Sequence, residues 1–316
     1  MSRGRSLWLA AQWVFAAAVI WYAARSLTGQ WAEVGSTLRS IRPMWGYIAT
    51  ASLLVLFTYA LLIESWRRLL SAWSARLSWP HAARIWLASN LGKYVPGKIW
   101  SILAMGALAK EKGASALAAG GSSVVMQIVS VITGLAVAAA FGASSQGITW
   151  LAAAAVALML AAITVAPYLL PRAFAFIGTI TGRALTAPPV PVRPVWLATL
   201  ATTVAWLIAG LAFRMFAGAL GVTRGDTSAY IAVYAASYVA GFLALFVPGG
   251  LGVREGALIA TMQRAGLATP VEAAAVAVAS RIWLTVLEVI PGLIALAIPG
   301  SRGSASVGET KPGKAG

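Results

Sequence analysis

Long apolar runs separated by short connections extend along almost the whole sequence and limit the folds open to it. About 20 apolar residues are enough for a helix to cross the hydrocarbon core of a bilayer. Hydrophobic residues make up 60% of the 316 residues and charged residues only 10%, whereas soluble proteins carry about 25% charged residues. The sequence therefore predicts an all-α polytopic membrane protein. Six spanning helices are expected, at residues 7–25, 45–64, 114–141, 148–170, 194–219 and 271–298.

Two further apolar segments are interrupted in the middle. The first, residues 81–112, contains the stretch "NLGKYVPGKIW", and neither apolar flank alone reaches spanning length. The second, residues 227–266, has a first arm long enough to span, which ends at "VPGGLGVREGAL". Proline cannot donate a backbone hydrogen bond and glycine tolerates a left-handed backbone, so each Pro-Gly pair is expected to break a helix.

The residues around the first break favour a re-entrant hairpin that binds an anion. Freed backbone groups at membrane depth must be buried in protein or face a wet cavity. Lys93 and Lys98 flank Pro96-Gly97, and they add positive charge where the exposed N–H groups of a helix break already favour anions. The alternative is a kinked helix whose lysines reach the membrane surface.

The two breaks also indicate an internal repeat. Pro96 and Pro248 lie 152 positions apart, and each break follows two expected spanning helices and precedes one. The halves start on opposite sides of the membrane, which is the inverted-topology repeat of many secondary transporters. The expected organisation is one membrane domain with two repeats and a disordered cytoplasmic tail, at about residues 1–300 (repeats 7–141 and 148–298) and 301–316.

The distribution of basic residues predicts the orientation. If both interrupted segments enter and leave on the same side, fourteen basic residues fall on one side of the membrane and four on the other. The positive-inside bias then places both termini in the cytoplasm and the protein in the cytoplasmic membrane. Nucleic acid is not an expected partner, because no basic patch is interleaved with aromatic residues on a polar surface.

The sequence offers little for catalysis. It has no cysteine, one histidine (His81) and one aspartate (Asp226), which excludes disulfides and thiolate metal sites and leaves few groups for acid–base chemistry. No metal or other cofactor is expected, and the protein is not expected to be an enzyme. No nucleotide-binding motif occurs either, so any transport is expected to be downhill or ion-coupled.

Further charged residues lie within apolar segments. Arg254 and Glu255 follow the second break, and Arg281 and Glu288 lie two turns apart on one face of the last expected helix. Such residues commonly line a pathway, and pairing between helices for assembly is the alternative. Glu64, three and four residues before Arg67 and Arg68, is expected to pair with them at a membrane boundary.

Three motifs in order, "SNLGKYVPGKIW", "VPGGLGVREGAL" and "SRIWLTVLEVIPG", make the chain resemble the membrane region of lysylphosphatidylglycerol synthases, which also occurs as stand-alone flippase-like proteins. The resemblance covers nearly the whole hydrophobic part, and it implies movement of a lipid across the bilayer. Together with Tyr94 of the first motif, the motif positions give the candidate substrate-binding residues: Asn90, Lys93, Tyr94, Pro96, Gly97, Lys98, Pro248, Gly249, Gly250, Arg254, Glu255, Arg281 and Glu288. Lys93 departs from the arginine expected in many relatives, and lysine lacks bidentate phosphate geometry.

The sequence therefore predicts a flippase or transporter for an anionic lipid: a phospholipid, an aminoacyl-phospholipid or a polyprenyl-phosphate-linked glycan. The synthase domain of the bifunctional members is expected to be absent, so no lysine transfer is expected. One alternative is a non-transporting partner of a separate glycosyltransferase or lipid synthase; another is a membrane-embedded lipid-modifying enzyme. Expected partners are membrane lipids, such a synthase or glycosyltransferase, and a second copy of the chain.

Overall fold

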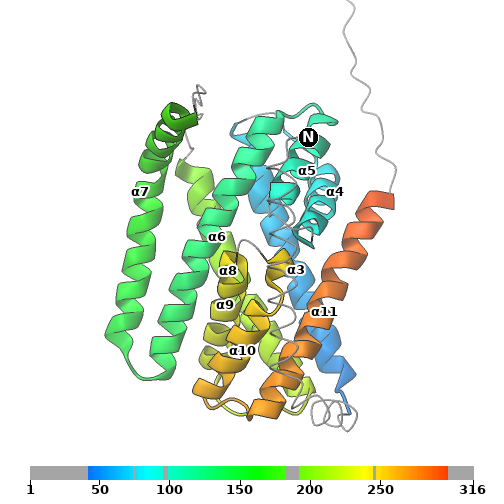
Figure 1. The fold of residues 1–316 in the computed structure, drawn as a ribbon, viewed down its shortest axis with the longest axis vertical. Helices are drawn as coiled ribbons and strands as arrows, with labels where there is room; N and C mark the ends of the chain where they lie inside the picture. Colours follow the sequence, from blue (N-terminus) through cyan, green and yellow to red (C-terminus); the bar gives the residue numbers. More distant parts are fainter. Residues whose placement is uncertain (1–41, 74–75, 95–98, 182–191, 245–246, 298–316) are drawn as a thin grey trace, which may run out of the picture.

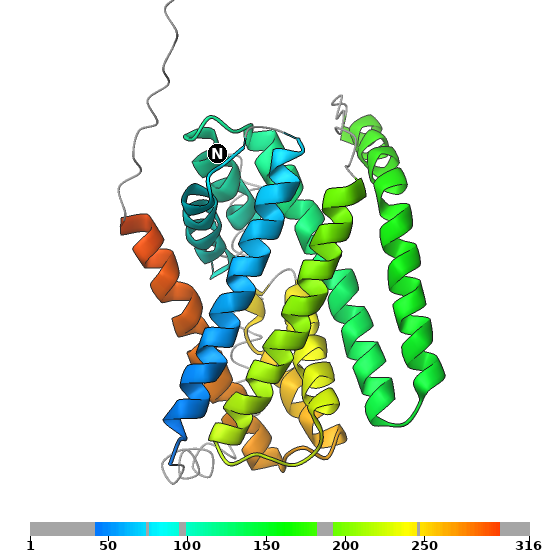
Figure 2. The same ribbon diagram turned by 180° about the vertical axis from the view of Figure 1, so that it is seen from behind.

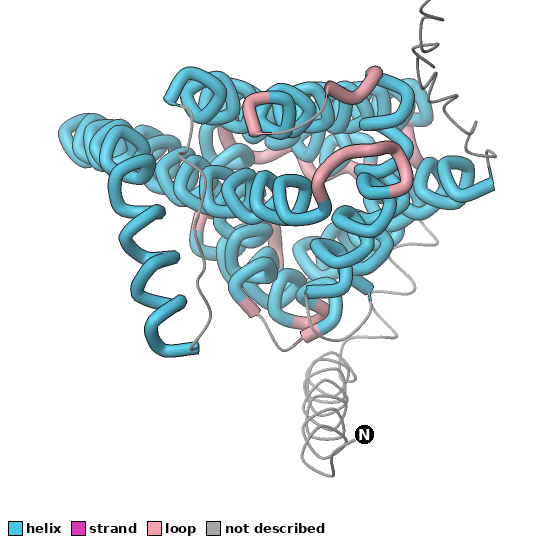
Figure 3. Tube along the Cα trace, turned by 90° about the horizontal axis from the view of Figure 1, so that it is seen from above, coloured by secondary structure: helices cyan, strands magenta, loops and turns pink. Residues whose placement is uncertain are grey.

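The described part of the chain is entirely helical. The computed structural model describes residues 42–73, 76–94, 99–181, 192–244 and 247–297, and every regular element in these ranges is a helix. The view along the long axis shows helices joined by short loops and no strand within this part (Figure 3). Several predictions lie outside the described residues: the helix at 7–25, the residues Pro96, Gly97 and Lys98, and the tail at 301–316.

Long apolar helices occur where the sequence predicts them. Among the described residues, four helices are long and apolar enough to cross a membrane: α3 (Trp45–Ser71), α6 (Ala116–Ser145), α8 (Val192–Ala219) and α11 (Pro270–Ala297). A fifth predicted range corresponds to α7 (Thr149–Thr181), which is apolar along Thr149–Val165. The chain is therefore a multi-pass membrane protein, and its many exposed leucines and valines are the surface such a protein presents to lipid.

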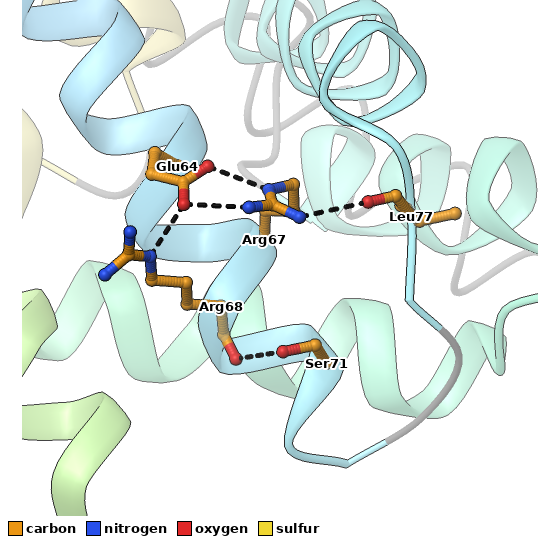
Figure 4. Close-up of polar contacts among 5 residues, drawn as sticks. All are labelled: Glu64, Arg67, Arg68, Ser71 and Leu77. Atoms are coloured by element: carbon orange, nitrogen blue, oxygen red, sulfur yellow. Dashed lines mark hydrogen bonds and ion pairs between the residues drawn. The ribbon is translucent and has the colours of Figure 1, made fainter.

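The helix α3 continues beyond its predicted end at residue 64. Glu64 accepts hydrogen bonds from Arg67 at 2.8 Å and from Arg68 at 2.6 Å, as the spacing predicts (Figure 4). Arg67 also donates to the carbonyl of Leu77, which ties the chain after α3 back to the helix. Oppositely charged pairs three and four residues apart stabilise a helix. The charged residues after position 64 are therefore part of α3, which continues to Ser71.

Neither interrupted segment is one continuous helix. The first consists of α4 (Trp79–Asn90), the 3₁₀ turn η1 (Leu91–Tyr94) and α5 (Ile99–Lys110). The second consists of α9 (Thr227–Leu243), the 3₁₀ turn η2 (Pro248–Gly250) and α10 (Val253–Arg264). In Figure 1, α4 and α5 lie in the upper half of the molecule and α9 and α10 in the lower half. The two turns, η1 and η2, meet near mid-height and pack against each other.

The long helices surround these two pairs. α3 and α8 lie side by side in an antiparallel arrangement on the face shown in Figure 2, and α7 packs on α6 at the edge of the molecule. The lower half has an aromatic core in which Phe216 stacks on Trp283 at 4.3 Å between ring centroids. The packing leaves the region around η1 and η2 enclosed by α3, α6, α8 and α11.

Candidate functional site

The tip of the first helix pair is η1, where the backbone folds closely against α5. A Cβ atom on Gly92 would lie 2.7 Å from the backbone nitrogen of Ser101, so only glycine fits there. This close packing directs Asn90 and Lys93 toward the interior, where both line a cavity.

The tip of the second pair is η2, which is built from glycines with left-handed backbone. Gly249, Gly250 and Gly252 have φ angles of 57°, 66° and 79°. Residues other than glycine rarely adopt this left-handed conformation. A Cβ atom on Gly250 would lie 2.5 Å from the carbonyl oxygen of Gly241 on α9. The next helix, α10, begins with Glu255 accepting a 2.6 Å hydrogen bond from the backbone nitrogen of Gly252. These contacts fix the start of α10, and with it the position of Arg254.

The helix α11 contacts both tips through its two charged side chains. Glu288 pairs with Lys93 of η1 at 2.7 Å and accepts a hydrogen bond from the hydroxyl of Tyr94. Two turns away, Arg281 donates to the carbonyl oxygen of Gly249 in η2 at 3.0 Å and lies 3.6 Å from Glu255. One helix thus holds the tip of each half by a separate charged contact.

Among the described cations of the lining, Arg254 has the smallest exposed fraction, and no described carboxylate lies within ion-pair distance of it. Its side chain is 7% exposed, and its guanidinium lies over the rings of Tyr238 and Tyr234, 4.7 and 5.8 Å from their centroids. Within the described residues it forms no ion pair. Cation–π contacts stabilise the charge only in part, so Arg254 remains available to an anionic ligand.

These groups surround a single cavity of about 240 Å³. Its lining comes from both tips and from α3, α4, α5, α6, α8, α9, α10 and α11. Lys93, Arg254 and Arg281 line it together with one carboxylate, Glu288. The lining is therefore electropositive, in the middle of a molecule whose outer faces are apolar.

The sequence-predicted residues fall into four groups. Asn90, Lys93, Gly249, Arg254, Arg281 and Glu288 line the cavity. Three others are not in the lining but contact it or its support. Tyr94 donates a hydrogen bond to Glu288, Gly250 packs on the backbone of α9, and Glu255 lies beside Arg281. Pro248 lies in the backbone of η2, whereas Pro96, Gly97 and Lys98 are outside the described residues. Arg281 and Glu288 both line the cavity and contact neighbouring elements. That they line a transport pathway stays a prediction.

Sequence reasoning missed the uncharged polar and aromatic part of the lining. Ser123, Gln127 and Ser130 of α6 face the cavity, and their spacing of four and three residues places them on one face of the helix. This polar stripe in an otherwise apolar helix was a readable signal. Aromatic residues from α3, α4, α8 and α9 complete the wall: Tyr59, Trp66, Trp86, Trp206 and Tyr238.

The described lining presents groups that can bind an anionic or polar molecule. The described residues contain no group of three histidine, aspartate or glutamate side chains that could hold a metal ion. Both carboxylates near the cavity, Glu255 and Glu288, are paired with cations. What the site offers an incoming molecule is positive charge, hydroxyl and amide groups, and aromatic faces.

Comparison with known proteins shows the family of the chain. The family model described as the lysylphosphatidylglycerol synthase TM region matches residues 8–292, which is nearly the whole hydrophobic part of the chain. A search of curated proteins found no match.

Proposed function

The chain belongs to the family of lysylphosphatidylglycerol synthase transmembrane regions, and from this premise we propose that it carries the anionic headgroup of a lipid across the membrane. In this proposal the protein is a transporter and forms or breaks no covalent bond. The acyl chains stay in the surrounding bilayer while the headgroup passes through the interior of the protein.

One observation carries the proposal: two helix breaks far apart in the sequence meet at one electropositive cavity at mid-height. Gly249 of η2 lies close enough to Tyr94 of η1 that a Cβ atom on the glycine would be 3.6 Å from the tyrosine ring. A charged headgroup is costly in hydrocarbon. Buried cations and polar side chains at this depth lower that cost by replacing the water around the headgroup.

The proposed topology follows from the two helix pairs. Each pair enters and leaves the membrane on one side, with α4 and α5 entering from the opposite side to α9 and α10. The elements α3, α4–α5 and α6 then correspond to α8, α9–α10 and α11 in an inverted repeat. The end of the molecule that holds the C-terminus of α3 and the N-terminus of α8 carries many basic residues, among them Arg67, Arg68, Arg76, Arg84, Lys110, Lys112 and Arg193. The positive-inside bias assigns that end to the cytoplasm.

The mechanism uses the charged contacts of α11. An anionic headgroup that reaches Arg254 also comes near Arg281 and Lys93, and it competes with Glu255 and Glu288 for these two cations. Weakening the contact at one tip releases that helix pair from α11, while the contact at the other tip remains. Opening the tips alternately would expose the cavity first to one side and then to the other, as in other inverted-repeat transporters.

The test is transport by the full chain in phosphatidylcholine vesicles containing a trace of fluorescent phosphatidylglycerol. Dithionite added outside bleaches only the label in the outer leaflet, so continued loss of fluorescence reports movement from the inner leaflet. We expect Arg254→Gln to slow this movement by about 10- to 100-fold, because a hydrogen bond to a charged group contributes about 1.5–3 kcal/mol.

A matched control lies on the same helix. Arg264, at the end of α10, is exposed, so Arg264→Gln should transport at the wild-type rate. Arg254→Lys, which keeps the charge, should retain more activity than Arg254→Gln if all three variants have a wild-type melting temperature. Two results would refute the proposal. The first is that wild-type protein moves no anionic lipid faster than empty vesicles do, and the second is that Arg254→Gln transports at the wild-type rate.

A further inference from the structure

The lining of the cavity also restricts the chemistry of the headgroup. Resting on the proposed function, we infer that the headgroup is a phosphodiester bearing an uncharged polyol, such as glycerol or a single sugar ring. A headgroup that carries a cationic aminoacyl group is excluded from this cavity.

The charge balance excludes the cationic group. Three cations line the cavity, namely Lys93, Arg254 and Arg281, against the single carboxylate of Glu288. Glu288 is already neutralised by Lys93 at 2.7 Å. Glu255 is not part of the lining: its Oε2 accepts from the backbone of Gly252, and its buried Oε1, which has no hydrogen-bond partner among the described residues, lies 3.6 Å from Arg281. No carboxylate of the described lining is left for an ammonium group, and a second cation beside three others is repelled in a low-dielectric interior.

The aromatic rings nearest the cations do not offer a substitute. Tyr234 and Tyr238 could hold an ammonium group by cation–π contact, but Arg254 already lies over both rings. Likewise, Lys93 lies 5.5 Å from the centroid of the Tyr94 ring. A cation of the protein itself therefore already lies over each of these three tyrosine rings.

The lining also provides neutral hydrogen-bonding groups. Ser123, Gln127 and Ser130 lie on one face of α6, and Asn90 and Thr285 line the same cavity. Hydroxyl and amide groups can both donate and accept, as polyol hydroxyls do. The Gln127 amide contacts only Ser123 of the described side chains, at 3.3 Å, which leaves most of its donor and acceptor capacity for a ligand.

A buried donor without a partner adds an independent observation. Trp66 lines the cavity and is 1% exposed, and its indole Nε1–H has no acceptor among the described residues. An unsatisfied buried donor is costly, and a ligand oxygen in the cavity would remove that cost. Trp66 and Trp86 also add apolar surface to the lining, against which the C–H groups of a polyol can pack.

The cavity has room for such a headgroup. Its volume of about 240 Å³ accommodates a phosphate and one small polyol.

The experiment measures binding, so it does not depend on transport. Purified full-length protein in detergent is titrated with four short-chain lipids, and the melting temperature is recorded, since ligand binding to the folded state raises it. The lipids are dihexanoyl forms of phosphatidylglycerol, phosphatidylinositol, phosphatidylmethanol (a phosphodiester without a polyol) and lysyl-phosphatidylglycerol. Binding without transport in the vesicle assay would refute the proposed function and leave this inference standing.

We expect phosphatidylglycerol or phosphatidylinositol to bind about tenfold more tightly than phosphatidylmethanol, as for one or two additional hydrogen bonds, and lysyl-phosphatidylglycerol not to bind. The lipid that binds more tightly, phosphatidylglycerol or phosphatidylinositol, shows whether the site prefers a glycerol or a ring as the polyol.

In Gln127→Leu the tighter binding of the polyol lipids over phosphatidylmethanol should disappear, whereas Gln146→Leu, at the exposed end of α6, should behave as wild type. Equal binding of all four lipids, tighter binding of the lysyl lipid, or an unchanged Gln127→Leu variant would overturn the inference.

Discussion

Glu288 and Arg281 determine how the two halves of the site meet. Each lies on α11, and each contacts a tip from a different half of the chain: Lys93 for Glu288 and Gly249 for Arg281. The sequence predicted that both residues face a cavity, because a spacing of seven residues places them on one helix face. It could not predict their partners, since Tyr94 and Glu288 are 194 positions apart and no spacing rule connects residues on different helices.

The Lys93–Glu288 pair should contribute to stability as a unit. Removing one partner leaves the other charge uncompensated in a partly buried site, at a cost of about 2–3 kcal/mol. We therefore expect Lys93→Met and Glu288→Gln each to lower the free energy of unfolding by that amount. The double variant should lose less than the sum of the two, because it leaves no unpaired charge. Unfolding in mixed detergent micelles measures all four proteins, and additive losses would show that the two side chains do not interact.

At the scale of elements, small residues decide how closely the helices approach. Apolar runs predicted five of the described long helices, because length and hydropathy alone define a spanning helix. Their packing was not predictable in this way, since it depends on single positions such as Gly210 of α8. A Cβ atom there would lie 2.7 Å from the backbone Cα of Ile231 on α9. Close approach at small residues is typical of helix contacts in membranes.

Gly210→Ala should accordingly separate α8 from α9 and lower the melting temperature in detergent, although alanine favours helix formation by about 1 kcal/mol over glycine. The obstacle is backbone, which cannot rotate away as a side chain can. A Cβ atom on Gly218, two turns further along α8, would meet no neighbouring atom within 4 Å, so Gly218→Ala should keep or raise the melting temperature. An equal response of the two variants would contradict this account of the α8–α9 contact.

At the scale of the whole molecule, two interrupted segments from different halves enclose one cavity. The sequence predicted the breaks, since Pro-Gly pairs between apolar arms are visible in it, and it predicted most of the charged lining. It did not predict the neutral wall, because Ser123 and Gln127 were read only as parts of an apolar span. Their spacing places them on one helix face, but only the fold shows that this face lines the cavity.

The most direct test of the central claim, that a lipid headgroup passes through this cavity, is to block the cavity chemically and measure transport. The chain has no cysteine, so a single introduced thiol reacts alone. In Ser123→Cys, at an 8% exposed position of the lining, modification with a small methanethiosulfonate should stop movement of fluorescent phosphatidylglycerol, and bound short-chain lipid should slow the modification. In Leu135→Cys, at a 50% exposed position of the same helix outside the cavity, complete modification should leave transport unchanged. Undiminished transport by fully modified Ser123→Cys protein would contradict the claim.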